Sequence, residues 1–240
     1  MAATRPDARP LYAQVRDALK QDIQEGAWKP GDMLPSEFEL AAAYGVSQGT
    51  VRKALDALTR EHVLVRRQGI GTFVSAHTPA DVLFRFFQFR DTHGERVIPE
   101  SRPIRTSLGK ATRAERDKLG LTEGATVIRH VRIRLSGGHP FIYETIVLPE
   151  AIFPGLGAET ALPNTLYDKF QSDYGVTVAT AHEQLATAAA AGRAAASLGV
   201  PAGTPLLRID RRTVALDGRV IEWRLSLCHL DGLHYAVDVG

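Results

Sequence analysis

The chain has 240 residues, of which 44% are hydrophobic and 23% are charged, and its formal net charge at pH 7 is +2. This composition excludes a disordered or fibrous protein, and the length suffices for two domains that each bury a core. No apolar run reaches the roughly 18 residues of a membrane span, and residues 1–10 lack the apolar segment of a signal peptide. We therefore expect a soluble, cytoplasmic protein.

The chain holds a single cysteine, Cys228. One thiol excludes an internal disulfide and a cysteine-based zinc site. Cys228 lies in the apolar run Leu225–Leu230, so we expect a buried and unreactive side chain. The eight histidines show no His-x-x-x-His spacing. We expect neither a metal nor another cofactor.

Residues 11–60 carry the pattern of three short helices. Apolar residues recur at helical spacing in the first, at Tyr12, Val15, Leu19 and Ile23. The second begins with a capping box, in which the side chains of Ser36 and Glu39 each accept a bond from the other's backbone. It should bury Leu40, Ala43 and Tyr44 and end at Gly45. Ser47 can cap the third, whose apolar positions are Val51, Ala54, Leu55 and Leu58.

The segment Ser36–Arg60 is therefore predicted to be a helix-turn-helix with its tight turn at residues 45–46. Strands at 63–65 and 72–74, joined by a turn over 66–71, predict a β-hairpin wing after it. Residues 47–75 hold five basic side chains against two acidic ones, and the basic ones are Arg52, Lys53, Arg60, Arg66 and Arg67. A positive patch limited to one helix and the next hairpin fits a small DNA-reading surface.

Residues 77–82 are polar and contain a proline, which indicates a linker between domains at 1–76 and 83–240. After the linker the pattern is mixed α and β. Thr112 and Glu115 form a second capping box, for a helix through Leu119. We expect further helices at 165–174 and, in an alanine-rich stretch, at 186–198. Two pairs of strands are predicted, 126–135 with 141–148 and 206–216 with 220–227.

A weak internal repeat runs through this second domain at a constant offset of 79 residues. The matched positions are Leu119-Gly120-Leu121, Gly124, Arg129 and Arg132 with Leu198-Gly199-Val200, Gly203, Arg208 and Arg211. In each copy a helix ends in Leu-Gly, a glycine turn follows and a strand hairpin begins. Two such units can pair into one antiparallel sheet with helices on one face, so the whole chain is predicted to be an α+β protein.

Four motifs stand in order along the N-terminal domain. They are Pro10-Leu11-Tyr12, Gly31-Asp32-x-Leu34-Pro35-Ser36-Glu37, the run Val46–Leu55, and Arg67-Gln68-Gly69-x-Gly71-Thr72-Phe73-Val74. Together they resemble the winged helix-turn-helix of the GntR family of transcriptional regulators, over nearly all of residues 10–75. The resemblance implies a sequence-specific DNA-binding regulator.

The third helix should present its N-terminal end to the major groove. Once its apolar positions face the core, Gln48 and Arg52 lie on the outer face, where they can pair with an adenine edge and with guanine or a phosphate. The predicted DNA-contacting set is Ser36, Phe38, Ser47, Gln48, Gly49, Thr50, Arg52, Lys53, Arg66, Arg67, Gln68, Gly69 and Gly71. Each of these residues also has a structural interpretation: basic helix residues are often only solvated, and Phe38 can pack between helices.

The chain departs from the family pattern at Phe38 and Gln48, where many members carry arginines that contact DNA. Phe38 cannot donate a hydrogen bond, and Gln48 is polar but uncharged. We expect an operator sequence that differs from those of the commoner members, with less affinity drawn from charge.

The C-terminal domain resembles the UTRA effector domain of the HutC subfamily, which implies a chorismate-lyase-like α/β fold with an antiparallel sheet. The residues that carry the resemblance are Arg132-x-Arg134, Gly138-x-Pro140, Tyr143-Glu144, Leu148-Pro149, Leu166-Tyr167, Leu198-Gly199-Val200, Gly203-x-Pro205, Asp217-Gly218 and Glu222. A helical effector domain does not fit the strands and glycine turns here. A fused aminotransferase would need several hundred more residues.

Strand alternation places His130, Arg132 and Arg134 on one face. Glu144 shares a face with apolar residues in the next strand, so it should pair with Arg132 or Arg134. In related proteins these arginine and glutamate positions line an effector pocket. The predicted effector-binding set is His130, Arg132, Arg134, Glu144, Asn164, Thr165, Tyr167 and Glu222. Because paired arginines bind carboxylate or phosphate, we expect a small anionic metabolite.

Several alternatives remain open at this point. Arg132, Arg134 and Glu144 can form a cross-strand ion pair with no ligand, and Glu222 with Arg224 can be a surface pair. The protein can be a DNA-binding regulator without an effector. It can also be a lyase-like enzyme with Glu144 and Arg134 as its reactive pair. The function that fits best is a homodimeric repressor on an inverted-repeat operator, released when the metabolite binds.

Overall fold

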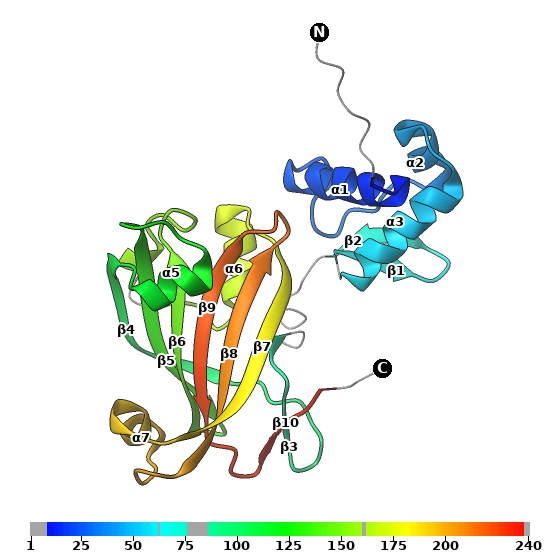
Figure 1. The fold of residues 1–240 in the computed structure, drawn as a ribbon. Coiled ribbons are helices and arrows are strands. Elements are labelled where there is room, and N and C mark those ends of the chain that lie inside the picture. The colour runs from blue at the N-terminus through cyan, green and yellow to red at the C-terminus, as the bar shows by residue number, and fades with distance from the viewer. Residues whose placement is uncertain (1–8, 62, 76–85, 160–161, 238–240) are drawn as a thin grey trace. The chain divides into compact units, whose positions relative to one another are not determined.

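The computed structural model describes residues 9–61, 63–75, 86–159 and 162–237. The chain divides into two compact units, residues 1–77 and 78–240 (Figure 1). The linker predicted at 77–82 lies outside the described residues. Among those residues, no helix is both long and apolar enough to cross a lipid bilayer.

The first unit is three helices followed by a two-stranded hairpin (Figure 1). Its elements are α1 (Leu11–Gln24), α2 (Glu37–Tyr44), α3 (Gln48–Arg60), β1 (Leu64–Arg67) and β2 (Gly71–Val74). Both predicted caps are confirmed. Ser36 and Glu39 form the reciprocal capping box of α2, and the Ser47 side chain accepts a bond from the backbone N–H of Thr50 at the start of α3.

The core of this unit lies where α3 crosses α1 and α2. The fully buried side chains there are those of Leu19, Val51, Ala54 and Leu58. Two predicted core positions were wrong. Tyr12 is 38% exposed, and Ala43 lies on the solvent face of α2, where Ala41 is buried in its place. A short helix buries only a narrow stripe against its neighbours, and a one-residue error in its phase changes which alanine faces the core.

The hairpin β1–β2 pairs in register from Leu64 with Val74 to Arg67 with Gly71. Residues 31–34 add a third extended segment, since Leu34 N–H donates to the Thr72 carbonyl at 2.8 Å. Gly71 has φ +154°, and a Cβ there would lie 3.1 Å from Met33 Sδ. The glycine therefore lets this preceding segment lie close to the hairpin.

The second unit is built on a six-stranded antiparallel sheet with the order β4-β5-β6-β9-β8-β7 (Figure 1). The strands are β4 (Glu100–Lys110), β5 (Thr126–Ser136), β6 (His139–Pro149), β7 (Val178–Ala189), β8 (Pro205–Ala215) and β9 (Val220–Cys228). The helices are α5 (Arg113–Leu119), α6 (Leu166–Tyr174) and α7 (Gly192–Leu198), with a 3-10 turn η1 (Leu156–Ala158).

The internal repeat is confirmed as a structural duplication. Each copy is a strand, a short helix and a hairpin: β4-α5-β5-β6 and then β7-α7-β8-β9. The two copies join through β6 and β9, which pair from Ile142 with Cys228 to Val147 with Trp223. The strand order of the second copy is therefore the reverse of that of the first, which gives the sheet a palindromic order with a local two-fold relation centred between β6 and β9.

One predicted element was wrong. The alanine-rich stretch 186–198 is not a single helix, because residues 186–189 belong to β7 and only Gly192–Leu198 is helical. Alanine has high helix propensity, but β7 pairs with β8 along its full length, to Ala189 opposite Pro205. Pairing with the sheet overrides the local preference.

The sheet carries helices on both faces. The repeat helices α5 and α7 pack on one face, against Val147, Trp223, Tyr143 and Leu227. Helix α6 and the turn η1 pack on the other face, against Ile128 and other strand residues that point to that side. The expected single helical face therefore holds for the repeat helices and fails for α6.

A second small sheet closes one end of the unit. It pairs β3 (Phe89–Asp91) with β10 (Leu233–Tyr235), so the last described strand lies beside the first (Figure 1). Phe89, Phe141 and Tyr235 stack edge to face there. Cys228 is fully buried in the same cluster, and burial raises the pKa of its thiol, as expected for an unreactive side chain.

Candidate functional site

The outer face of α3 forms the candidate DNA-reading surface. Val51, Ala54 and Leu55 anchor the helix in the core, which leaves Gln48 and Arg52 exposed at its N-terminal half. Gly49 and Lys53 are exposed beside them. A Cβ at Gly49 would meet only Ser47 Oγ, at 3.9 Å, so the fold itself does not require glycine at this position.

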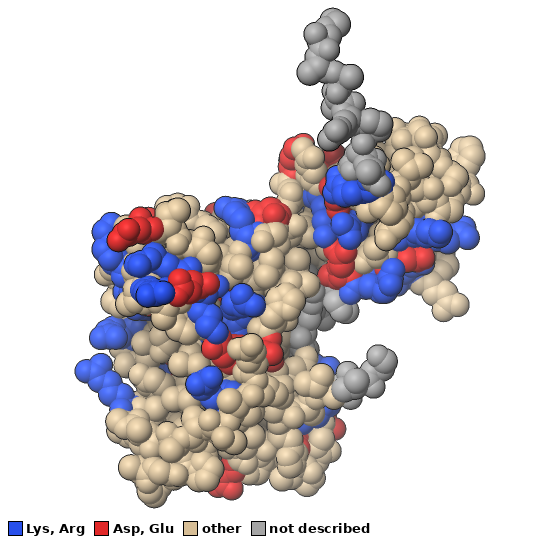
Figure 2. All heavy atoms as spheres, in the orientation of Figure 1, with Lys and Arg blue, Asp and Glu red and all other residues tan. Residues whose placement is uncertain are grey.

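The arginines on this surface are held by carboxylates of the same unit. Arg52 donates through Nε and Nη2 to Glu37 at 2.9 and 2.8 Å, and Arg66 lies 2.7 Å from Asp56 and 3.5 Å from Glu37. On the face in view in Figure 2, basic and acidic side chains of this unit are interspersed. In the free protein, Arg52 and Arg66 are therefore already paired with carboxylates.

The wing places its polar residues at an exposed tip. Gln68 and Gly69 are exposed, and Gly69 has φ +73°, a conformation that favours glycine in the tight turn. The Arg67 guanidinium lies 4.7 Å from the centre of the Phe73 ring, which orients this side chain along the hairpin.

The hydroxyl groups at the helix starts make contacts within the first unit. The hydroxyls of Ser36 and Ser47 are already used in caps, and Thr50 Oγ1 lies 2.9 Å from Ser47 Oγ. Phe38 does not pack between helices, because it is 70% exposed. An exposed phenylalanine on the DNA-reading side can contribute apolar contact but no hydrogen bond.

In the second unit, charged residues lie on a buried face of the sheet. Arg132 and Glu144 stand opposite each other in the β5–β6 register, and Arg132 Nε donates to Glu144 Oε1. Arg134 Nη1 lies 3.5 Å from the same carboxylate. All three residues are at most 2% exposed. The predicted pairing is confirmed, and it is buried.

The second copy of the repeat contributes another buried ion pair, Glu222 with Arg224 on β9. Glu222 accepts two bonds from Arg224, from Nε at 3.1 Å and Nη2 at 2.7 Å, and one from the Tyr167 hydroxyl at 3.0 Å. Arg224 also lies 3.6 Å from Glu144, so the two ion pairs are joined. Glu222 is fully buried and Arg224 is 8% exposed. The interpretation of this pair as a surface pair was wrong, because this face of β9 is covered by α6, whose Tyr167 contacts Glu222.

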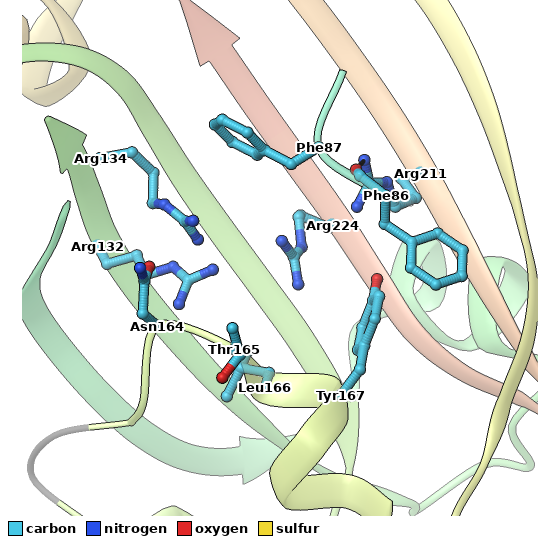
Figure 3. Close-up of a pocket in the computed structure, with 10 residues that line it drawn as sticks. All are labelled: Phe86, Phe87, Arg132, Arg134, Asn164, Thr165, Leu166, Tyr167, Arg211 and Arg224. Atoms are coloured by element: carbon cyan, nitrogen blue, oxygen red, sulfur yellow. Dashed lines mark hydrogen bonds between the residues drawn. The ribbon is translucent and has the colours of Figure 1, made fainter. Parts of the chain in front are cut away.

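These residues border a pocket of about 320 Å³, counting its opening to solvent (Figure 3). The lining residues are Phe86, Phe87, Arg132, Arg134, Asn164, Thr165, Leu166, Tyr167, Arg211 and Arg224. The guanidinium groups of Arg132, Arg134 and Arg224 point into one shared space, and Phe87 and Tyr167 flank it (Figure 3).

The structure brings five of the eight predicted effector residues to the pocket wall: Arg132, Arg134, Asn164, Thr165 and Tyr167. Glu144 and Glu222 lie behind the wall, where they hold the arginines. The sequence analysis missed the other wall residues, Phe86, Phe87, Leu166, Arg211 and Arg224. The sequence could have indicated Arg211 as a pocket residue, because it matches Arg132 in the internal repeat.

Arg134 is the least satisfied charge in the pocket. Its Nε and Nη2 are buried and have no hydrogen-bond partner among the described residues. Burial and the nearby Arg132 lower the pKa of Arg134 well below its ordinary value. For Glu144, burial alone would raise the pKa, but Arg132, Arg224 and Arg134 outweigh it and hold the pKa well below the usual range. The site is therefore short of negative charge at Arg134.

His130 lies behind the arginines and is fully buried. Its Nδ1 lies 2.9 Å from Thr106 Oγ1, and its Nε2 has no partner among the residues that the structure describes. Burial and the adjacent Arg132 lower the pKa of His130 to about 4. The ring is therefore neutral near pH 7 and adds no charge to the pocket.

Helix α6 begins at the pocket. Its N-cap residue, Thr165, makes no side-chain cap, so the first backbone N–H groups of α6 lack the usual partner. Asn164 donates from Nδ2 to the Pro99 carbonyl at 2.7 Å, which leaves its buried Oδ1 without a partner in the described structure. Buried arginines beside an uncapped helix start are suited to hold an anion.

The first unit is a DNA-binding module of the winged helix-turn-helix class, and comparison with known proteins identifies its family. Residues 11–74 match the family described as bacterial regulatory proteins, gntR family, and residues 95–234 match the UTRA domain. The transcriptional repressor NagR of Bacillus subtilis is 31% identical over 219 residues, which are 91% of this chain and 90% of NagR. The chain therefore belongs to the GntR family of bacterial transcription regulators, with the UTRA domain of the HutC type.

Other relatives agree with this assignment. A histidine utilization repressor of Pseudomonas putida is 34% identical over 146 residues, 60% of this chain and 59% of that protein. The crystal structure of PhnF from Mycobacterium smegmatis aligns with a TM-score of 0.56 at 25% identity, over 94% of this chain and 99% of PhnF. The ligand-binding domain of a GntR-family regulator from Bordetella bronchiseptica aligns with a TM-score of 0.60 at 30% identity, over 65% and 98%. The protein is a DNA-binding transcription regulator and not an enzyme.

Proposed function

We propose that this protein is a homodimeric repressor that binds an inverted-repeat operator and is released by a small anionic metabolite in the pocket of its second unit. Relatives are named as repressors, among them NagR and the mannosyl-D-glycerate system repressor MngR of Escherichia coli. Since its target is chromosomal DNA, we place the protein in the cytoplasm.

The observation that best supports an anionic metabolite is the pair of unpartnered buried donors on Arg134. A buried guanidinium with two unpartnered donors is costly, and an anion that accepts both bonds removes that cost. The ligand needs a higher affinity for one conformation of the protein, and a coupling of about 1–3 kcal/mol changes the affinity for the operator about 5- to 150-fold.

The DNA contacts that we propose are those of α3 and the wing. Gln48 and Arg52 read base edges, and Arg66, Arg67 and the wing tip hold the backbone or the minor groove. Because Phe38 and Gln48 replace the arginines of many members, the operator should differ from theirs.

The test compares Arg52→Ala with Arg208→Ala, an exposed arginine on β8 in the second unit. Gel shifts on DNA upstream of the protein's own gene measure binding. Arg52→Ala should lose operator binding, and Arg208→Ala should keep it. Normal binding by Arg52→Ala would overturn the assignment of the reading helix.

A second measurement tests release. Benzoate and glucose 6-phosphate serve as probe anions for thermal shift and then for the same gel shift. An anion that raises the melting temperature should also release the DNA. Binding without release, or no binding by any anion of a wider panel, would favour a regulator that works without an effector.

A further inference from the structure

The pocket of the second unit carries an excess of one positive charge. Four arginines line it, Arg132, Arg134, Arg211 and Arg224. Three carboxylates pair with them: Glu144, Glu222 and Glu183, the last of which lies 2.5 Å from Arg211. His130 is neutral near pH 7. A ligand with a single negative charge would balance the site.

The excess charge has a definite location and shape. Arg134 uses Nη1 toward Glu144, and its free donors are Nε and Nη2. These two nitrogens form one edge of the guanidinium, from which two parallel N–H groups point the same way. That edge fits the two oxygens of one carboxylate.

The rest of the wall is mostly aromatic or apolar. The Phe87 ring lies over the Arg134 guanidinium, with 5.0 Å between the ring centre and Arg134 Cζ. Phe86 meets Tyr167 edge to face. Leu166 completes this side. The Tyr167 hydroxyl is already bonded to Thr213 and Glu222. Hydroxyls of a sugar ring could meet partners only at Asn164 and Thr165, because the side formed by Phe87, Leu166 and Tyr167 offers none, and unpaired buried hydroxyls weaken binding.

The Asn164 side chain offers an acceptor on the wall. Asn164 Oδ1 is buried and unpartnered among the described residues, and its amide is fixed by the bond to the Pro99 carbonyl. It can accept a hydrogen bond from a hydroxyl or N–H group of a ligand.

We propose, resting on the metabolite-responsive function above, that the effector is a planar aromatic monocarboxylate rather than a phosphate ester. Its carboxylate binds the Nε–Nη2 edge of Arg134, its ring packs between Phe87, Leu166 and Tyr167, and a donor on the ring reaches Asn164 Oδ1. A phosphate ester, with close to two charges at neutral pH, would leave a buried negative charge unbalanced.

The test uses ligands that share one ring. Titration calorimetry at pH 8 compares benzoate, 4-hydroxybenzoate, benzamide and phenyl phosphate, with glucose 6-phosphate as a polar ester. At this pH the phosphate esters carry two charges, because their second pKa is about 6. We expect benzoate to bind at least about tenfold more tightly than benzamide, phenyl phosphate and glucose 6-phosphate, a difference of about 1.4 kcal/mol. 4-Hydroxybenzoate should bind more tightly than benzoate.

Two variants locate the binding. Arg134→Gln should weaken benzoate binding at least about tenfold, and Arg208→Gln, which removes the same charge from an exposed position, should not change it. If Arg134→Gln fails to fold, the ligand comparison on the unaltered protein still decides the ligand class.

The outcomes separate this inference from the proposed function. Tighter binding of phenyl phosphate or glucose 6-phosphate, lost in Arg134→Gln, would overturn the monocarboxylate and keep the anion-responsive repressor. Absence of benzoate and 4-hydroxybenzoate binding would also overturn the monocarboxylate. Benzoate binding that is unchanged in Arg134→Gln would overturn the monocarboxylate site at Arg134 and leave the repressor to be decided by the gel shifts, because benzoate would then bind elsewhere.

Discussion

Glu144 is the residue on which the buried charges of the second unit depend. Arg132 donates to it, Arg134 and Arg224 lie 3.5 and 3.6 Å away, and the Ser226 hydroxyl lies 3.3 Å from its Oε2. A single carboxylate therefore holds guanidinium groups from both copies of the repeat. Breaking a buried ion pair by removing one partner leaves the other charge uncompensated.

We predict that Glu144→Gln lowers the free energy of unfolding by about 3–5 kcal/mol, because its arginines lose their shared counter-charge. Urea denaturation measures the change. Glu123→Gln, at an exposed position of the same unit, is the matched control and should change stability by less than about 0.5 kcal/mol. Equal stability of the two variants would mean that the buried cluster does not contribute to folding.

His130 should give the second unit a pH dependence. Its pKa is about 4 in the folded protein and about 6.5, the ordinary value, in the unfolded chain. Between these two pH values the unfolded chain therefore binds more protons than the folded protein does. The stability from neutral His130 is complete above about pH 6.5 and falls as pH drops toward 4. The loss at pH 4 should be about 3 kcal/mol, at about 1.4 kcal/mol per pH unit.

The measurement is urea denaturation of the protein and of His130→Gln between pH 4 and pH 8. In the variant, the free energy of unfolding should lack the part of the pH dependence that comes from His130. Carboxylates such as Glu144 still lose their stabilising charge at lower pH in both proteins. Parallel curves for the two proteins would contradict the buried neutral histidine.

Part of the pocket could be predicted at the level of residues. Strand alternation puts Arg132 and Arg134 on one face of their strand and puts Glu144 on a face with apolar residues in the next strand, where an unpaired carboxylate is costly and should find an arginine. Arg224 could not be placed in this way. Its position depends on β9 joining β6 at the centre of the sheet, which no local pattern shows. The place of Phe87 in the pocket could not be predicted either, because it depends on how the first residues of the second unit pack against the sheet.

At the scale of elements, α2 restrains α3 through charge as well as packing. Glu37, in the first turn of α2, holds Arg52 of α3 and lies 3.5 Å from Arg66 of the wing. The same carboxylate would repel DNA phosphates. We therefore expect Glu37 to oppose DNA binding, although it also orients Arg52 and Arg66 in the free protein.

We predict that Glu37→Gln tightens operator binding several-fold and makes it more salt-dependent, because released arginines can neutralise about one more phosphate. Gel shifts over a range of salt concentrations give both the affinity and the slope. Glu123→Gln, which makes the same change of charge in the other unit, should leave both unchanged. Weaker binding by Glu37→Gln would show that Glu37 mainly positions Arg52.

The boundaries of helices and hairpins followed well from caps and glycine turns, as at Ser36, Thr112 and Gly218. The long edge strands did not. In β7 and β4 the side chains are largely exposed, so neither strand shows the apolar alternation of a half-buried strand. Such strands are specified by the partner that they pair with, and the sequence of the strand alone does not reveal it.

At the scale of the whole molecule, the two units have separate cores and separate tasks. The pocket is built only from residues of the second unit, and the reading surface only from the first. If the repressor is a dimer, a single first unit contacts half an operator and loses the benefit of its tethered copy.

We predict that the fragment 1–77 binds the operator at least about 100-fold more weakly than the full chain, because the second half-site is no longer held at high effective concentration. The fragment 78–240 should fold on its own and bind the same probe anion as the full chain. Gel shifts and calorimetry measure the two effects. Equal operator affinity of the fragment 1–77 and the full chain would contradict a dimer held together by the second unit.

The palindromic order of the six-stranded sheet has an evolutionary consequence. A chain with one copy of the repeat would complete the same sheet by pairing with itself, and Arg132 and Arg211 would then be one residue present twice around an axis. β5 now carries Arg134 where β8 carries Thr213, 79 positions later. The two unpartnered donors of Arg134 thus lie at a position where the two copies of the repeat differ, so the buried charges do not follow the two-fold symmetry of the strand order.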